Sequence, residues 1–408
     1  MPPTPSEEDF PGIISVDDHV VEPRQLWQQE LPARWRDRGP RTVREKVRLE
    51  YVGGVYSFER DVDDGRWCDV WLFDDLVYPT GLLHAPVGYA PGDIHNFPAT
   101  YEDFRPGAYE QGARLEDMAV NHVDAAMCFP NVFPRFCGQG FAERRDKELS
   151  LASLRIYNDW MIDEWCGGEG RGRLIPLTLV PLWDAKLAAD EVWRCATKGS
   201  HAIAFTENPH RLGLPTMYSG HWEPLWQACE DTDTVVAIHI GSSSQMPSTS
   251  PDAPPAVSAV LTSQNAQGVM CDWVFSGSLS RHPTLRILLA EAQVGWMPYV
   301  LERMDTVWRE SPGWNGVELT EPPSDIVRGS VYGCLFDDPT GLANRDAIGI
   351  DALMFETDYP HSDGTWPRSR SVAHRICAAA GLDADEVYGL LRGNAISCLG
   401  LERFGIAH

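Results

Sequence analysis

Residues 14–23 read ISVDDHVVEP, and in this stretch a short apolar run ends abruptly in charged side chains. The apolar residues before position 17 predict a buried strand, which then continues into Asp17, Asp18 and His19. Burying a carboxylate or an imidazole is costly unless a partner satisfies it, and a divalent metal ion is such a partner. Asp17 and His19 point the same way in an extended chain, because side chains alternate along a strand.

Seven more apolar runs follow at even intervals, and most are separated by segments with helical spacing and helix-start residues. The runs are DAAMCFPN (124–131), RLIPLTLVP (173–181), HAIAFTEN (201–208), TVVAIHIG (234–241), LRILLAEA (285–292), SVYGCLF (330–336) and DALMFETDYP (351–360). Continuous apolar strands alternating with helices indicate a parallel sheet buried on both faces. Eight such units predict an α/β fold of the (β/α)₈ TIM-barrel type.

The barrel pattern is interrupted after its first strand. We expect residues 1–29 to hold the N-terminal segment and the first strand, residues 30–110 to form an insertion, and residues 111–408 to complete the barrel. The insertion alternates and turns like a small β-sheet and then becomes rich in glycine and proline. Because active sites of barrels lie at the carboxyl ends of the strands, we expect this β-rich segment to cover the barrel mouth.

Chemically active side chains recur where the predicted strands end. His239 ends the fifth strand, Glu291 the sixth and Asp358 the eighth, which in a barrel brings them to the same face as Asp17 and His19. Imidazoles and carboxylates together suit Zn²⁺, Mn²⁺ or Fe²⁺. Taken singly, His239 also fits a hydrogen-bonded core histidine, and either aspartate fits a helix N-cap. The coincidence of several such groups favours a single divalent metal ion.

The composition excludes several other classes of protein. The 408 residues include 59 acidic and 34 basic side chains, and the resulting formal charge of −25 disfavours binding to nucleic acid or to an anionic membrane. No apolar run approaches the roughly 20 residues of a membrane span, and the opening MPPTPSEEDFPG lacks the basic and apolar parts of a signal peptide. Ten cysteines without a CxxC pair indicate reduced packing thiols, so we expect a cytoplasmic protein.

The opening VDDHVVEP resembles the D/H-x-H-x-x-E start of the amidohydrolase superfamily. Together with AIHIG, SRHPTLRILLAEA, FETDYPHSDGTWP and the closing GNAISCLGL, it resembles the branch called amidohydrolase family 2, over about residues 12–401 except the insertion. That branch includes aminocarboxymuconate semialdehyde decarboxylase and the γ-resorcylate-type decarboxylases. The resemblance implies a barrel with one metal ion.

Carried over by position, the resemblance implies that Asp17, His19, His239 and Asp358 are the metal ligands. An acidic residue at the first ligand position is more similar to the decarboxylases than to the hydrolases, which start with H-x-H. One position departs from the family, because the decarboxylases usually have a histidine at the end of strand six, where this chain has Glu291. We expect Glu291 to ligate or tune the metal, the alternative being a salt bridge to Arg135 or Arg368.

Two chemistries suit this arrangement. In a lyase, the metal ion chelates a substrate carboxylate while Asp358 passes a proton to the carbon that loses carbon dioxide. In a hydrolase, the metal ion activates a water for attack on a cyclic amide, ester or lactone, and Asp358 is the general base. We favour decarboxylation of an aromatic or unsaturated carboxylic acid, with hydratase or retro-aldol chemistry, or a catalytically inactive binding barrel, as further alternatives. His239, Glu291 and Asp358 are the predicted catalytic residues.

Further residues are candidates for substrate binding because of their places near the predicted mouth. His361 follows strand eight, Glu207 and His210 follow strand four, and His95 lies in the insertion near several aromatic residues. An aromatic lid would suit a flat carboxylic acid. The predicted helix GWMPYVLERMDTVW (295–308) has more apolar surface than one flank of a barrel needs, so we expect a homodimer or homotetramer.

Overall fold

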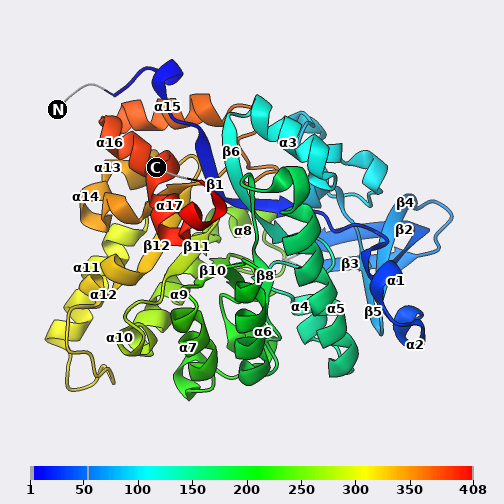
Figure 1. The fold of residues 1–408 in the computed structure, drawn as a ribbon, viewed down its shortest axis with the longest axis horizontal. Coiled ribbons are helices and arrows are strands. Elements are labelled where there is room, and N and C mark those ends of the chain that lie inside the picture. The colour runs from blue at the N-terminus through cyan, green and yellow to red at the C-terminus, as the bar shows by residue number, and fades with distance from the viewer. Residues whose placement is uncertain (1–3, 53–54, 407–408) are drawn as a thin grey trace.

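Parallel strands alternate with helices along most of the chain in the computed structural model, which describes residues 4–52 and 55–406 (Figure 1). The parallel strands are β1 (Ile13–Val20), β6 (Val123–Pro130), β7 (Leu174–Ile175), β8 (Thr178–Leu179), β9 (Ala202–Phe205), β10 (Val235–His239), β11 (Ile287–Ala290), β12 (Val331–Leu335) and β13 (Leu353–Phe355). They pair in the orders β1-β6-β7 and β13-β12-β11-β10-β9-β8, so neighbours in space follow the chain. This is an α/β fold of the TIM-barrel type, as the sequence predicts.

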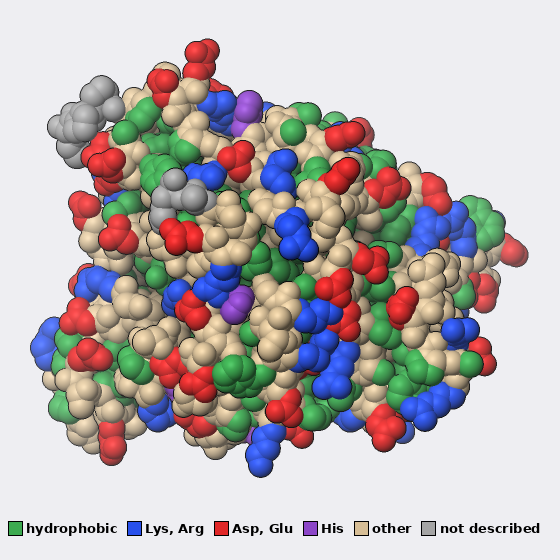
Figure 2. Space-filling model, in the orientation of Figure 1, with side chains coloured by type: hydrophobic (Ala, Val, Ile, Leu, Met, Phe, Trp, Pro, Cys, Tyr) green, Lys and Arg blue, Asp and Glu red, His purple; other side chains and the backbone are tan. Residues whose placement is uncertain are grey.

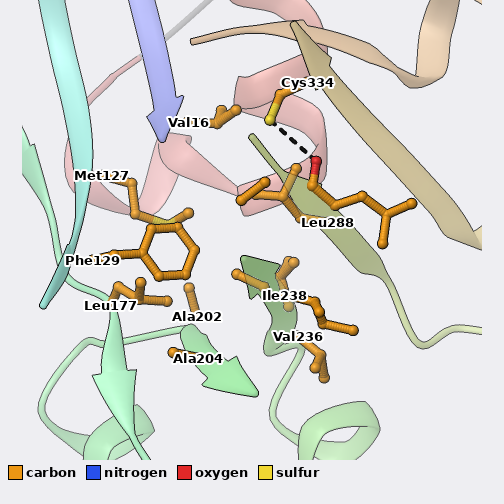
Figure 3. Close-up of a cluster of buried hydrophobic side chains, with 14 of the residues drawn as sticks. Val16, Met127, Phe129, Leu177, Ala202, Ala204, Val236, Ile238, Leu288 and Cys334 are labelled. Carbon is orange, nitrogen blue, oxygen red and sulfur yellow. Dashed lines mark hydrogen bonds between the residues drawn. The ribbon is translucent and has the colours of Figure 1, made fainter. Parts of the chain in front are cut away.

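The strands are apolar because they are covered on both sides. Every residue of β9, β10, β11 and β13 is buried. Inward side chains such as Val16, Phe129 and Ile238 come from different strands and point toward one another (Figure 3). Parallel strands buried in this way lose the polar alternation of a half-exposed sheet. The interior is therefore a packed core, and only the strand ends are free for chemistry.

The third predicted strand is broken into two pieces. The sequence predicts one run over 173–181, whereas β7 ends at Ile175 and β8 begins at Thr178. Pro176 lies in the gap and has no N–H to donate to a neighbouring strand. The two halves pair on opposite sides, β7 with β6 and β8 with β9.

The start of the chain lies beside its last strand. The N–H of Asp358 donates to the carbonyl of Asp17 at 3.0 Å, and the N–H of His19 donates to the carbonyl of Tyr359 at 2.6 Å. Asp18 joins the same segments, because its Oδ1 accepts hydrogen bonds from the hydroxyl of Thr357 (2.6 Å) and the N–H of Tyr359 (3.3 Å). Asp17, His19 and Asp358 are thereby placed on adjacent backbone segments.

The longer helices surround the parallel strands (Figure 1). Asp146 caps the first turn of α5 by accepting from the N–H of Leu149, and Asp184 caps α6 through the N–H groups of Lys186 and Leu187. The α-helices are α1 (Leu26–Glu30), α2 (Ala33–Arg36), α3 (Gln111–Val120), α4 (Gln139–Ala142), α5 (Lys147–Trp160), α6 (Ala185–Thr197), α7 (Glu223–Asp231), α8 (Pro255–Leu261), α9 (Ser263–Phe275), α10 (Ser278–Arg281), α11 (Met297–Glu310), α12 (Pro323–Ser330), α13 (Pro339–Ala343), α14 (Arg345–Ile348), α15 (Ser369–Ala380), α16 (Ala384–Tyr388) and α17 (Asn394–Leu399).

A separate antiparallel sheet follows the first barrel strand. It consists of β2 (Arg41–Val52), β3 (Val55–Arg60), β4 (Arg66–Phe73) and β5 (Leu76–Pro79), in the order β3-β2-β4-β5. Trp71 of this sheet is fully buried against Trp27 and Phe133, with ring centroids 5.4 and 5.3 Å away. The sheet therefore packs on the main core through aromatic side chains.

Charges of both signs are interspersed over the face of the molecule seen in Figure 2. Among the described residues, no helix is long and apolar enough to span a membrane. All ten cysteines are free thiols, and nine of them are buried. The predicted role of the cysteines in packing agrees with this burial.

Candidate metal centre and active-site pocket

Two histidines from distant parts of the chain face each other at the carboxyl ends of β1 and β10. The Nε2 atoms of His19 and His239 lie 3.0 Å apart, and both side chains are buried. Nδ1 of His239 lies 2.5 Å from the carbonyl oxygen of Ile240, which makes Nδ1 the protonated nitrogen. The other nitrogen of His239 therefore directs a lone pair toward His19.

Two buried carboxylates complete this cluster. Asp17 approaches His19 Nε2 at 3.6 Å and His239 Nε2 at 3.5 Å, using one oxygen for each. Oδ1 of Asp358 lies 3.4 Å from His19 Nε2. Both oxygens of Asp17 and Oδ2 of Asp358 are buried without a hydrogen-bond partner. Unpaired buried oxygens beside imidazole lone pairs are satisfied at once by a cation at the centre of the cluster.

The donor set fits one divalent metal ion. The ligand atoms of Asp17, His19 and His239 lie within 4.8 Å of one another, and Asp358 adjoins them through His19. Donors about 2.1 Å from a common ion lie roughly 3.0 to 3.5 Å apart, and the separations between these atoms are 3.0, 3.4, 3.5 and 3.6 Å. Burial, followed by the charges of Glu356 and Asp358, raises the pKa of Asp17 well above its ordinary value. A bound cation has the opposite effect and favours the ionised carboxylate.

Glu291 lies at the edge of the same cluster. Its Oε2 is 3.1 Å from Nε2 of His239, and its side chain is 16% exposed. Burial and then the charge of Asp358 raise the pKa of Glu291 well above the ordinary value. Arg135 pairs with Glu143 instead, so the alternative salt bridge from Arg135 to Glu291 is not formed. The backbone of Glu291 is left-handed, with φ of 53°, a conformation that costs energy outside glycine.

His361 connects the carboxylate cluster to Asn131 and, through it, to His84. Its Nδ1 lies 2.9 Å from Oδ1 of Asp358, and its Nε2 lies 3.3 Å from Oδ1 of Asn131. The side-chain amide of Asn131 donates to the carbonyl of His84 at 2.6 Å. Burial lowers the pKa of His361 to about 4. This chain of contacts fixes the orientation of Asp358 from three separate segments.

A cavity of about 560 Å³ opens onto this cluster and combines apolar walls with a few polar groups. Phe136 lies over the ring of His239, with centroids 4.1 Å apart. Leu83 and Tyr78 reach the cavity from the segment after β1, so residues of that segment line it together with Glu291 and His361. The complete lining is Tyr78, Leu83, His84, Asn131, Arg135, Phe136, Gln139, Ile240, Gly241, Ser244, Met246, Thr262, Glu291, His361, Ser362 and Asp363.

Three residues predicted to bind substrate do not line this cavity. Glu207 is buried, and its oxygens accept hydrogen bonds from the N–H of Gly241 (3.0 Å), the hydroxyl of Ser243 (2.5 Å) and the amide of Asn265 (3.0 Å). Glu207 thus holds the loop after β10, because its acceptors are already used. His210 and His95 are exposed and lie outside the lining residues. Of the predicted substrate contacts, the structure brings only His361 to the cavity.

Sequence reasoning missed three residues at the site. Asn131 and Phe136 follow β6, and the polar and aromatic run that ends this strand was a usable signal. Glu356 is fully buried behind Asp17, where its Oε2 accepts the N–H of Glu291 at 3.1 Å. Burial raises the pKa of Glu356 to about 7. Its position directly after the last strand gave little indication, because Asp358 two residues later explained the same pattern.

Glu22, the last charged residue of the opening stretch, has a structural partner of another kind. Its carboxylate accepts three backbone hydrogen bonds, from the N–H groups of Asn131 (2.7 Å), Val132 (3.1 Å) and Phe133 (3.2 Å). These bonds fix the loop that carries Asn131 and Phe136 into the cavity. The charged residues of 14–23 therefore have two kinds of role. Asp17 and His19 are candidate metal donors, and Glu22 anchors a loop.

A parallel α/β barrel with histidines and aspartates converging at its strand ends defines a metal-dependent enzyme of the hydrolase or lyase class. The family model described as amidohydrolase matches residues 71–401, and the chain belongs to this family. The matched region includes His239, Glu291 and Asp358 and begins after the strand that carries Asp17 and His19. Comparison with curated proteins found no match.

Solved structures share the fold at low sequence identity. An amidohydrolase from Mycobacterium avium subsp. paratuberculosis K-10 is 20% identical with a TM-score of 0.68, covering 96% of this chain and 99% of that one. The 5-carboxyvanillate decarboxylase from Novosphingobium aromaticivorans DSM 12444, complexed with manganese and 4-hydroxy-3-methoxy-5-nitrobenzoic acid, is 17% identical (TM-score 0.62, 98% of both chains). A dihydroxybenzoic acid decarboxylase from Polaromonas sp. JS666, with bound manganese and the inhibitor 2-nitroresorcinol, is 16% identical (TM-score 0.60, 96% and 98%).

Proposed function

We propose that this enzyme is a metal-dependent, non-oxidative decarboxylase of an aromatic or unsaturated carboxylic acid. The observation that carries the proposal is the meeting of Asp17, His19 and His239 with Asp358, beside a largely apolar cavity whose lining residues Phe136, Glu291 and His361 contact this cluster. Such a site suits a flat acid whose carboxylate reaches the metal. Decarboxylases of hydroxylated benzoic acids are among the proteins that share the fold.

The metal ion is held by Asp17, His19, His239 and Asp358 in this proposal, and zinc, manganese and iron all suit the donors. When bound, such an ion acts as a Lewis acid and orients the substrate carboxylate. Phe136 and Leu83 confine the ring of the substrate from the cavity walls, and together they exclude water from the reacting carbon. In this arrangement the ion would hold the substrate carboxylate, and the cavity walls would hold the ring.

Asp358 is the proton donor of the reaction. As the bond between the ring and its carboxylate breaks and carbon dioxide leaves, the ring carbon keeps the electron pair and takes a proton from Asp358. His361 lies 2.9 Å from Asp358 and orients its carboxyl group. Because Asp358 is fully buried, the proton it carries is protected from exchange with bulk water during this step.

A second candidate function is hydrolysis, and the position of Glu291 favours it. This extra carboxylate is 3.1 Å from His239, close enough to act as a general base for a water molecule bound at the centre. The substrate is then a cyclic amide, ester or lactone. Hydration and retro-aldol cleavage use the same donors and remain further alternatives.

The organisation of the chain follows from the same proposal. We propose a closed barrel formed by residues 1–29 and 111–408, with residues 30–110 inserted as a lid, since Tyr78, Leu83 and His84 line the cavity. We also propose a cytoplasmic homodimer or homotetramer. The apolar groove between α9 and α11, where Tyr299 is 72% exposed, supplies a surface for such an assembly. A small carboxylic acid is the expected ligand, rather than nucleic acid or membrane.

Release of carbon dioxide tests the proposal directly. Purified protein reconstituted with manganese or zinc is incubated with a panel of hydroxybenzoic acids, and both carbon dioxide and the decarboxylated phenol are measured. A parallel panel of lactones and cyclic amides detects hydrolysis. Hydrolytic product without carbon dioxide would establish the second function, and Asp358→Asn, which removes the proton donor, serves as the inactive control in both panels.

A further inference from the structure

Acidic side chains outnumber basic ones in the lining of the cavity beside the metal centre. Glu291 and Asp363 line it, and the lining residues Glu291 and His361 contact His239 (3.1 Å) and Asp358 (2.9 Å) of the metal centre. Among the described residues that line the cavity, Arg135 is the one lysine or arginine. An anionic substrate entering this field is attracted at two places, the metal ion and Arg135. The position of Arg135 therefore bears on which acids the enzyme accepts.

Arg135 is held at the rim by contacts from two loops. It follows β6, and its Nη1 donates to the hydroxyl of Ser244, after β10, at 3.1 Å. Its Nη2 donates to Glu143 on the outer side. The next residue, Phe136, lies against the ring of His239. Arg135 therefore directly precedes, in the chain, the side chain of Phe136 that contacts the predicted metal ligand His239.

The guanidinium retains free hydrogen-bonding capacity. A guanidinium has five N–H donors, and the described residues accept from Nη1 and Nη2 but not from Nε. The side chain is 22% exposed, which is partly buried but open to the cavity. The backbone of Arg135 is left-handed, with φ of 55°, and such strain is retained where the surrounding structure requires one side-chain direction. A planar carboxylate matches the remaining donors of this fork.

We propose that Arg135 determines substrate specificity by binding a second anionic substituent, remote from the substituent at the metal. The substrate class is then an aromatic acid that carries two acidic groups on opposite sides of its ring, with the ring between Leu83, Phe136 and Met246. This inference rests on the proposed function in one respect, that the cavity is the substrate site. It adds that Arg135 recognises the second acidic group, which stays on the ring when carbon dioxide leaves.

A pair of probes that differ by one carboxylate tests this inference through binding rather than turnover. The first probe is 4-hydroxy-3-methoxy-5-nitrobenzoate, and the second is 2-methoxy-6-nitrophenol, which lacks only the carboxylate opposite the phenol. Affinity of each for the manganese-loaded enzyme is measured by calorimetry. We expect the acid to bind roughly tenfold to a hundredfold more tightly, as a hydrogen-bonded charge pair contributes.

Variants assign this preference to Arg135. In Arg135→Gln the two probes should bind equally, with the affinity for the phenol unchanged, which also shows that the cavity is intact. Arg135→Lys should keep a reduced preference, and Glu143→Gln, which removes the competing carboxylate, should keep or increase it. If Arg135→Gln fails to fold, the role of Arg135 is tested by the other two variants, in which the preference for the acid should be reduced in Arg135→Lys and kept or increased in Glu143→Gln.

Results with the variants or with the wild-type enzyme could each overturn the inference. Among the variants, these results are an unchanged preference for the acid in Arg135→Gln and a preference in Arg135→Lys equal to that of the wild type. For the wild-type enzyme, they are equal binding of the two probes and binding of neither. An Arg135-dependent preference without carbon dioxide release from hydroxybenzoic acids that carry a second carboxylate would instead refute decarboxylation and leave the specificity role standing.

Discussion

The Nε2 atoms of His19 and His239 meet 3.0 Å apart, although 220 positions separate the two residues in the chain. Two neutral imidazoles gain little from facing each other inside a protein. They do so here beside Asp17, whose two oxygens have no hydrogen-bond partner in the described structure. A cation explains all three side chains together, because each then contributes an electron pair to one centre.

Removal of one imidazole should therefore remove the metal ion. We expect His239→Ala to lose most of its bound metal and its activity, and elemental analysis of purified protein measures the first effect. Chelation of the wild-type enzyme should lower its melting temperature, since a ligand at 100 times its dissociation constant stabilises the folded state by about 2.7 kcal/mol. Metal retained at full occupancy in His239→Ala would exclude His239 as a ligand.

Glu291→Gln separates the possible roles of the extra carboxylate. The substitution keeps the shape of the side chain and removes a charge 3.1 Å from His239. We expect weaker metal binding by roughly tenfold or more, as for partners that orient ligands, together with a lower kcat. Activity lost with metal retained would make Glu291 a group that moves protons or positions substrate. Unchanged metal content and turnover would show that Glu291 has no part in the site.

His361 should act on the reaction through Asp358. We expect His361→Leu to lower kcat by about 10²- to 10⁴-fold, the range for a misplaced acid or base, with metal content unchanged. His361→Asn can still donate to Asp358 and should recover part of the rate. His95→Leu is the matched control, because His95 is exposed and outside the cavity lining. Equal losses in His361→Leu and His95→Leu would contradict the role.

Glu22 should contribute to stability rather than to chemistry. Glu22→Gln replaces one oxygen that accepts backbone N–H groups by an amide nitrogen that cannot, and an unsatisfied buried donor costs about 1–3 kcal/mol. Denaturant unfolding should show this loss. The exposed Glu169→Gln is the control and should change stability by less than about 0.5 kcal/mol. A Glu22→Gln protein as stable as the wild type would mean that the loop after β6 is held by other contacts.

His84 should make the folded protein sensitive to acid. Burial lowers its pKa to about 4 from the ordinary 6.5, so between these values the unfolded chain binds a proton that the folded chain does not. Stability contributed at higher pH is therefore lost as the pH falls from about 6.5 toward 4, by up to roughly 1.4 kcal/mol per pH unit. His84→Asn should reduce this slope in unfolding measured across that range. An identical slope in both proteins would exclude the contribution of His84.

The sequence predicted the strands better than the cavity. Seven of the eight apolar runs each correspond to one parallel strand. The remaining run, over 173–181, is divided at Pro176 into β7 and β8. Glu207 and His210 follow β9 at the correct end of the barrel, yet neither lines the cavity. The position of a residue after a strand specifies only at which end of the barrel its loop lies. The direction of each side chain beyond it depends on neighbouring loops that are distant in sequence.

What the sequence by itself determined is the α/β fold and which strand ends carry candidate metal donors, because burial on both faces imposes apolar runs and makes every polar strand end conspicuous. The tertiary structure alone decided how the remaining polar groups are used. Glu22 and Glu207 are both acidic residues near the mouth, but neighbouring backbone N–H groups occupy them, whereas Asp17 is left without such donors. Which buried carboxylate oxygens are left without a hydrogen-bond donor, as both oxygens of Asp17 and Oδ2 of Asp358 are, depends on the packed structure.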